Sequence, residues 1–102
     1  SIKLKTDNTI VGMFGLIKVN KNTGGIFLLY TDKLRKGNII TFLRQAKRQI
    51  RNWEHKYKLL LDTCDKDNKV IQKWLKILGF SPSDFQDEKF QIWYKGDLNY
   101  YD

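Results

Sequence analysis

The sequence contains very little of the chemistry that disulfides and metal sites need. Its 102 residues include one cysteine, Cys64, and one histidine, His55. A single cysteine excludes an internal disulfide and a thiolate cluster, and a single histidine argues against a histidine-based metal site. We therefore expect no bound metal, and the cysteine content fits a reducing, intracellular setting.

Proline and long apolar runs are also scarce. The chain has one proline and no stretch of the roughly 18 consecutive apolar residues that a membrane-spanning helix needs. The first residues, SIKLKTDNTIVG, lack the apolar core of a secretory signal. The length, with 41% hydrophobic and 14% aromatic residues, predicts a single domain over residues 1–102 with one modest core.

Positive charge is abundant. The 19 lysines and arginines outnumber the 11 acidic residues and give a net charge of +8. A surface of this kind attracts nucleic acid, acidic proteins and anionic cofactors, so charge alone leaves all three classes of partner open.

The first third of the chain predicts a β-hairpin. Residues 10–19 and 25–31 are rich in β-branched and apolar side chains, and Asn22-Thr23-Gly24-Gly25 between them has the composition of a turn. Residues 1–5 are expected to add an edge strand. Both hairpin strands are apolar on two faces, so we expect each face of the sheet to be covered.

A long amphipathic helix is predicted over residues 38–57, with Asn38 as its N-cap. Apolar residues recur there at intervals of four and three, as on one helical face: Ile39, Leu43, Ala46, Ile50, Trp53 and Tyr57. The opposite side carries Arg44, Lys47, Arg48 and Arg51. This basic face is either a binding surface for nucleic acid or an acidic protein, or an ordinary solvated face.

The rest of the chain predicts a strand over residues 58–62 and a helix over 68–78 capped by Asp67. Gly79 is the expected left-handed stop of that helix. The sequence SPSD, in which Pro82 blocks helix continuation, is predicted to be a turn, and residues 90–94 alternate as a last strand. The order β-β-α-β-α-β predicts an α/β (α+β) fold with a mixed, largely antiparallel sheet and two helices.

The series of a strand, an asparagine and a short helix ending in Leu-Gly-Phe resembles part of the GNAT acyltransferase fold. The matching residues are Asn68, Leu78, Gly79 and Phe80, preceded by LLLDTCDKDN. The segments LLYTDKL, FLRQAKR and WLKILGF extend the resemblance to GNAT-like acyltransferase-related proteins of short-tailed bacteriophages, some of them internal virion proteins. The resemblance covers about residues 25–80, and it implies a reduced GNAT-like domain that lacks the usual N-terminal helices.

The resemblance implies a coenzyme A pyrophosphate loop before the long helix, of the form Arg/Gln-x-x-Gly-x-Gly/Ala. Asn38 and Ile40 stand where glycines are expected, and Ile40 is large enough to crowd a phosphate. An ordinary solvated helix start is the other interpretation of this stretch. The cofactor-binding candidates are Arg35, Lys36, Gly37, Asn38, Ile39 and Asn68.

The resemblance also implies a tyrosine in the short helix that protonates the leaving thiolate, but Leu75 occupies that position. Tyr30, Tyr57 and Tyr94 are possible substitutes that the sequence does not place. Three acids at the end of the strand are candidate general bases, although turn and cap roles suit them better; they are Asp62, Asp65 and Asp67. Cys64 has no visible histidine partner and is interpreted as a buried structural thiol.

These departures lead to three hypotheses about function. The first is a phage-type, non-catalytic protein that needs no cofactor and binds a virion component or a host protein, in the host cytoplasm or within a phage particle. The alternative is an acetyl-CoA-dependent N-acyltransferase that modifies an amine or a protein lysine. The second alternative is a nucleic-acid-binding protein that uses the basic helix over residues 38–57. Without N-terminal helices, an uncovered sheet face would also favour a homodimer.

Overall fold

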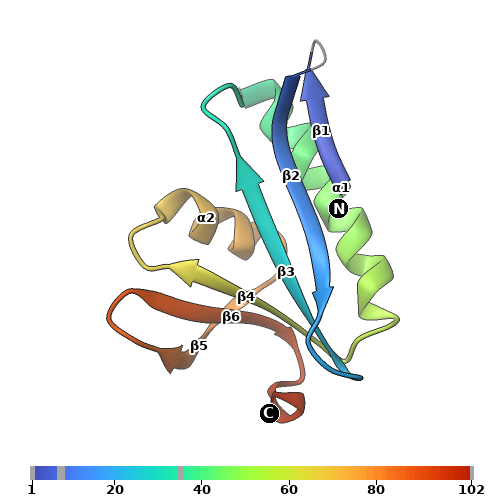
Figure 1. Cartoon of the computed structure of the whole chain (residues 1–102), viewed down its shortest axis with the longest axis vertical. Coiled ribbons are helices and arrows are strands. Elements are labelled where there is room, and N and C mark those ends of the chain that lie inside the picture. The colour runs from blue at the N-terminus through green and yellow to red at the C-terminus, as the bar shows by residue number, and fades with distance from the viewer. Residues whose placement is uncertain (1, 7–8, 35, 102) are drawn as a thin grey trace.

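The computed structural model describes residues 2–6, 9–34 and 36–101 of the chain (Figure 1). These residues form six strands, two α-helices and a short 3-10 helix. In chain order the elements are β1 (Ile2–Thr6), β2 (Thr9–Lys18), β3 (Thr23–Tyr30), α1 (Lys36–Glu54), β4 (Leu59–Asp65), α2 (Lys69–Ile77), β5 (Ser81–Gln86), β6 (Phe90–Gly96) and η1 (Leu98–Tyr100).

The strands make one sheet in the order β1-β2-β3-β4-β6-β5. Only β3 and β4 pair in parallel within the described residues; the other neighbours are antiparallel. This confirms the predicted mixed, largely antiparallel sheet with two helices.

The predicted order of elements was incomplete at β5, because SPSD is not a turn but the start of that strand. Pro82 pairs with Trp93, and β5 is an edge strand. A proline is tolerated there, since an edge strand can turn its missing N–H away from its one neighbour. The predicted edge strand at the N-terminus and the hairpin of β2 and β3 are confirmed. The turn lies earlier than predicted, because Thr23, Gly24 and Gly25 already belong to β3.

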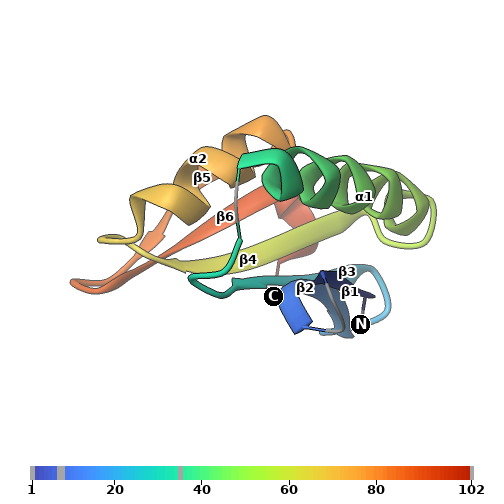
Figure 2. The ribbon, with the colours of Figure 1, turned by 90° about the horizontal axis from the view of Figure 1, so that it is seen from above.

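Both helices lie on the same face of the sheet, as Figure 2 shows. The main core lies between these two layers. Rings from β2, α1 and α2 meet there: the centroid of Phe42 lies 5.6 Å from that of Phe14 and 5.7 Å from that of Trp74. Phe42 thereby joins the two helices to the N-terminal half of the sheet.

The other face of the sheet is partly open. Ile17, Val19 and Leu29 remain 63%, 53% and 52% exposed. The C-terminal segment covers only one end, where the Thr23 hydroxyl donates a hydrogen bond of 2.9 Å to the carbonyl of Tyr100. The expectation that both faces are covered is therefore wrong for the described residues, because neither helix lies on this side. The homodimer stays a prediction.

The boundaries of α1 differ from the prediction. The helix begins at Lys36, so Asn38 lies in its first turn and is not the N-cap. A preceding turn, in which the N–H of Leu34 donates to the carbonyl of Thr31 at 3.1 Å, leads the chain into the helix early. The helix ends at Glu54 rather than at residue 57, since the chain must turn back to enter β4.

The start of α2 also differs by one residue. Asn68, not Asp67, is the N-cap, and its side-chain oxygen accepts a hydrogen bond of 3.1 Å from the N–H of Ile71. The N–H of Asp67 donates instead to the Asp65 carboxylate at 2.9 Å. Asp67 therefore belongs to the turn that precedes the helix. At the other end Gly79 has φ +93°, which confirms the predicted left-handed stop.

Candidate functional site

The parallel strands β3 and β4 separate along their length, and we call the space between their separated ends the β3–β4 gap. Residues 23–25 of β3 pair with residues 59–61 of β4. Beyond these pairs, β3 continues to Tyr30 and β4 to Asp65 with no described pairing between them, and Figure 1 shows the two strands diverging. Both facing edges therefore keep backbone donors and acceptors that an extended ligand can use.

Asp62 lies at the apex of this gap, because it directly follows the last residue of β4 that pairs with β3. It alternates with Leu60 and Cys64, which belong to the core beneath the helices, so its side chain points to the helix side. Its antiparallel partner is the buried Trp93. Asp62 is thus an acid in an apolar setting, and only 8% of it is exposed.

Burial raises the pKa of the Asp62 carboxyl to about 7, and a hydrogen bond from the backbone of Thr63 lowers it in part. A carboxyl of this kind gains and loses a proton near neutral pH. The gap therefore holds a group suited to proton transfer.

Tyr30 lies at the wide end of the gap, at the last position of β3. Its ring centroid lies 5.0 Å from that of Trp74 in α2, and 41% of the residue is exposed. An apolar hollow of about 200 Å³ adjoins it on the sheet, lined by Gly12, Met13, Leu29, Tyr30 and Thr31. Tyr30 is therefore the candidate tyrosine that lies at the separated end of the two strands.

The other two candidate tyrosines lie elsewhere. Tyr57 is at the paired end of the strands, where a Cβ on Gly24 would approach its ring to 3.3 Å. Tyr94 pairs with Leu61, which is the last residue of β4 that pairs with β3, so it lies beside the paired part of the two strands. Leu75, at the position where the resemblance implies a tyrosine, is completely buried in the core and supplies no proton.

The first turn of α1 follows the wide end of β3. The first four N–H groups of an α-helix have no partner within the helix. A Cβ built on Gly37 would meet nothing within 4 Å, so the backbone there is open to a ligand. Ile40 lies in the second turn, where its N–H is bonded inside the helix, and a glycine is not needed at that position to expose the backbone.

The phosphate-loop prediction stays untested as a whole. Arg35 lies outside the described residues, and Lys36, Gly37, Asn38 and Ile39 are the first four residues of α1. The side-chain oxygen of Asn68 caps α2, so a structural role is enough to explain an asparagine at this position. Its contact with a cofactor stays a prediction.

The three candidate acids differ in their surroundings. The carboxylate of Asp65, the last residue of β4, accepts the N–H of Asp67, which lies in the turn between β4 and α2. The turn interpretation therefore accounts for them, but it does not account for Asp62, which lies inside a strand. The prediction from the sequence did not separate Asp62 from the other two acids; its position within LLLDTC, two residues from Leu60 and Cys64, is the signal that could have done so.

Cys64 fits the predicted role of a structural thiol. It is buried, and burial raises its pKa to about 11, with further increases from the negative charges of Asp62 and Asp65. The nucleophilic form of cysteine is the thiolate, which this environment disfavours.

Another hollow lies away from the gap. It measures about 470 Å³ and is lined mainly by residues of β5 and β6, with Thr63 of β4 at its edge. Thr63 points to the face opposite Asp62, because adjacent residues of a strand alternate in direction. This hollow therefore does not reach the buried acid, and we place the candidate site in the β3–β4 gap.

The structure brings the four predicted basic residues of α1 together. Arg44, Lys47, Arg48 and Arg51 are all exposed and line one shallow hollow of about 220 Å³. Among the described residues, no helix has the length and apolar character that crossing a membrane requires.

No protein-family model and no curated protein matches the sequence. Solved structures do match. An acetyltransferase of the GNAT family from Bacillus anthracis superposes with a TM-score of 0.73 at 16% identity, over 92% of this chain and 63% of that one. The Campylobacter jejuni N-acetyltransferase PseH, solved with acetyl coenzyme A, gives a TM-score of 0.65 at 17% identity, over 91% and 64%.

A ribosomal-protein-alanine N-acetyltransferase from Brucella melitensis gives a TM-score of 0.70 at 14% identity, over 93% of this chain and 67% of that one. The chain spans less than two thirds of the length of the first two structures. The fold is thus the GNAT fold, which confirms that part of the predicted resemblance. The relationship to bacteriophage proteins is not shown.

Proposed function

We propose that this chain is the acyl-CoA-binding and catalytic part of a GNAT-type N-acyltransferase. The observation that carries the proposal is the β3–β4 gap with the buried Asp62 at its apex. The similarity in fold to acetyltransferases, one of them solved with acetyl coenzyme A, supports it. This reverses the order of the hypotheses drawn from the sequence, in which binding without catalysis came first.

The residues present suit an acyl-CoA ligand at two places. The unpaired edges of β3 and β4 can hydrogen-bond an extended, amide-bearing arm as a strand would. The open first turn of α1, with Lys36 and the uncrowded Gly37, offers N–H groups and positive charge to phosphate. The ligand supplies an acyl carbonyl activated as a thioester.

Asp62 acts as the general base in this proposal. In its ionised form it removes a proton from an ammonium group and makes the amine a nucleophile. Tyr30 acts as the acid and donates its phenolic proton to the sulfur as the carbon–sulfur bond breaks. The amine nitrogen has by then attacked the acyl carbon and keeps the acyl group. It gives its second proton to the Tyr30 phenolate through water, and the proton held by Asp62 returns to water.

A titration with acetyl-CoA tests binding. We expect a dissociation constant in the micromolar range and a rise in melting temperature, because a ligand at about 100 times its dissociation constant stabilises a protein by about 2.7 kcal/mol. Absence of both heat and a melting shift at millimolar ligand would remove the basis of the proposal.

An assay for free thiol with a panel of primary amines tests catalysis. We expect Asp62→Asn to bind acetyl-CoA normally but to lose activity by about 10²-fold or more, as removal of a general base does. Wild-type activity should rise with pH through about 7, the pKa of Asp62. Asp84→Asn, an exposed acid of β5, is the matched control and should retain full activity. Equal losses in both variants would exclude the role given to Asp62.

Binding without catalysis is a second candidate, favoured by the exposed apolar side chains on the open face of the sheet. Ile17 and Leu29 are more than half exposed, at 63% and 52%. A virion or host protein as the partner is a proposal that rests on the sequence resemblance alone. Acetyl-CoA binding without turnover on any amine would favour this candidate.

A further inference from the structure

The outer face of α1 is a concentrated region of positive charge. Phe42, Ala46 and Ile50 bury the inner face of the helix against the sheet. The outer face presents four exposed cations that line a common hollow of about 220 Å³; they are Arg44, Lys47, Arg48 and Arg51. We call these four residues the α1 basic face.

No carboxylate in the part of the chain that the structure describes neutralises this face. Among the described residues, none of its four side chains forms an ion pair or a hydrogen bond with another side chain. Glu54 is the only acid in the sequence of α1, and its carboxylate is bound to the Lys95 ammonium at 2.8 Å. The positive charge of the face is therefore available to a ligand.

The face continues onto β1 as a polar strip. Arg48 also borders a second hollow of about 360 Å³, which it shares with Lys3, Gln45 and Gln49. Arginine, lysine and glutamine side chains all donate hydrogen bonds to phosphate oxygens. None of the described residues that line the two hollows is aromatic or aliphatic, so these residues offer donors but no stacking platform for bases.

The spacing of the charges suits a row of phosphates. Arg44, Arg48 and Arg51 follow one another by four and three residues along one side of the helix, a rise of about 10 Å. One strand of a duplex carries a phosphate about every 3.4 Å along the axis, so this row spans about three of them.

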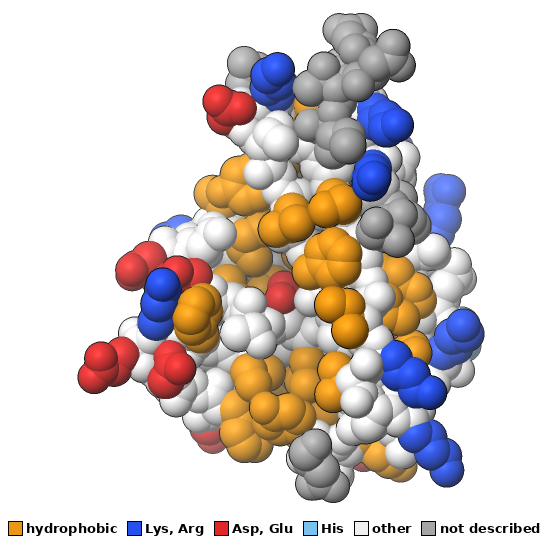
Figure 3. All heavy atoms as spheres, viewed as in Figure 1, with side chains coloured by type: hydrophobic (Ala, Val, Ile, Leu, Met, Phe, Trp, Pro, Cys, Tyr) orange, Lys and Arg blue, Asp and Glu red, His pale blue; other side chains and the backbone are white. Residues whose placement is uncertain are grey.

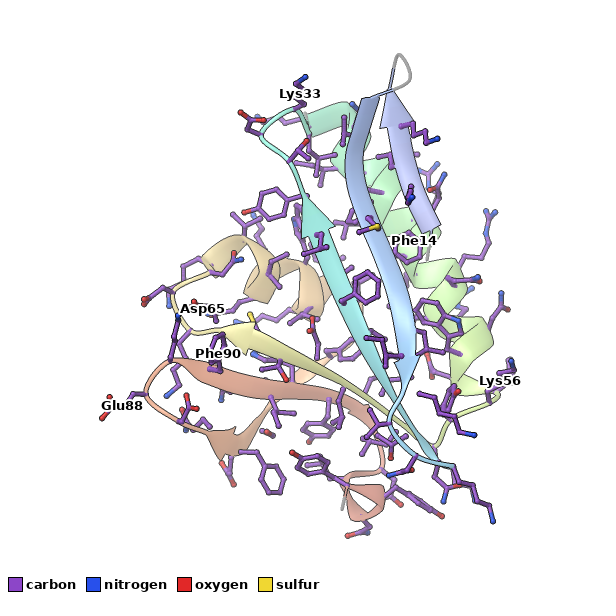
Figure 4. The ribbon with its side chains drawn as sticks, viewed as in Figure 1. Phe14, Lys33, Lys56, Asp65, Glu88 and Phe90 are labelled. Atoms are coloured by element: carbon purple, nitrogen blue, oxygen red, sulfur yellow. The ribbon has the colours of Figure 1, made fainter. Side chains whose placement is uncertain are left out.

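Acidic side chains gather at another part of the molecule. In Figure 4, Asp65 and Glu88 lie at the end that holds the β4–α2 turn and the β5–β6 hairpin, while Lys33 precedes and Lys56 follows α1. Figure 3 shows the same separation, with most of the blue side chains on the α1 and β1 side. This separation of charge orients a polyanion toward α1.

We propose that the α1 basic face, extended by Lys3, Gln45 and Gln49, binds the phosphodiester backbone of nucleic acid without base specificity. An acidic protein is the less suitable occupant. It would need an apolar anchor, and the apolar hollow of Ile40, Leu43 and Ile77 includes Arg44 and Lys47 but not Arg48 or Arg51. This inference is independent of the proposed acyl transfer, because none of these residues borders the β3–β4 gap.

The test is fluorescence anisotropy with a labelled random-sequence DNA duplex of about 20 base pairs, at several salt concentrations. Four phosphate contacts predict a slope of log K against log salt of about −3 to −4, or a loss of about 100-fold in affinity between 50 mM and 200 mM salt. Replacing the four residues of the α1 basic face by glutamine should remove most of this slope.

A control variant changes the same net charge elsewhere, by Lys33→Gln, Lys66→Gln, Lys73→Gln and Lys89→Gln together. It should retain most of the affinity and of the slope, and circular dichroism checks that both variants are folded. Equal losses in the two variants, or wild-type binding that does not depend on salt, would overturn the proposal. Competition by poly-L-glutamate as effective as that by unlabelled duplex would overturn it too, in favour of an acidic protein. The α1 variant should keep the acyl-transfer activity of the wild type, which would show that DNA binding and acyl transfer use different surfaces.

Discussion

The β3–β4 gap and the α1 basic face use opposite physical means to present a functional group. In the gap, a carboxyl gains its reactivity from burial, which raises its pKa to about 7. On α1, four cations are available to a ligand because they are exposed and no carboxylate of the described residues pairs with them. Changes in the gap should therefore alter stability and pH dependence strongly, whereas changes on the helix surface should alter only salt-dependent binding.

The largest effect is expected where the helix layer meets the N-terminal half of the sheet. Phe42 is fully buried, its ring packs against Phe14 and Trp74, and a Cβ on Gly12 would approach it to 2.9 Å. Phe42→Ala should lower the free energy of unfolding by about 4 kcal/mol, through lost burial and a cavity. Urea denaturation measures this change in the free energy of unfolding. A decrease of less than about 1 kcal/mol would show that the core collapses around the cavity.

Asp62 should make stability depend on pH. Its pKa is about 7 in the folded protein, whereas an unfolded aspartate has a pKa of about 3.9. The folded state holds the proton more tightly, so this contribution to stability is fully present below about pH 4 and is lost as the pH rises through 7. Between about pH 5 and pH 8 the loss should be about 3 kcal/mol.

Urea denaturation of the wild type and of Asp62→Asn at both pH values isolates this contribution, because asparagine does not titrate. The variant should lose less stability on going to the higher pH. The same pH dependence in both proteins would show that the carboxyl is ionised in the folded state near its usual pKa.

Substitutions at two glycines should change stability by smaller amounts and in opposite directions. Gly96 has φ +113°, and a Cβ there would lie 2.3 Å from the carbonyl oxygen of Lys58, so Gly96→Ala should destabilise the protein by at least about 2 kcal/mol. Gly37 lies in the first turn of α1 with open space around it, and Gly37→Ala should stabilise the protein by about 0.5 kcal/mol. Melting curves compare the two, and effects of the same sign would contradict the geometry.

The smallest effect on stability is expected on the α1 basic face. Arg48→Gln should change the free energy of unfolding by less than about 0.5 kcal/mol, because the side chain is exposed and makes no ion pair in the described structure. The same variant should reduce the salt slope of DNA binding by about 1. A large drop in melting temperature would show instead that the arginine supports the helix.

The sequence by itself predicted the elements whose patterns are local. The 4-3 spacing of α1, the glycine stop of α2 and the turn-linked hairpin each depend on neighbouring residues, so they could be found without the tertiary structure. The limits of the helices were less predictable. Asn68 and Asp67 are both good caps, and the hydrogen bond from Asp67 to Asp65 decided between them.

Only the tertiary structure decided what the candidate site contains. Pro82 could be recognised as part of an edge strand only from the strand order, and Tyr30 could be distinguished from Tyr57 and Tyr94 only from the separation of β3 and β4. The sequence contained Asp62 and the apolar residues beside it. Its raised pKa, however, depends on the helix layer and β6 that bury it, and burial is set by contacts between segments far apart in the chain.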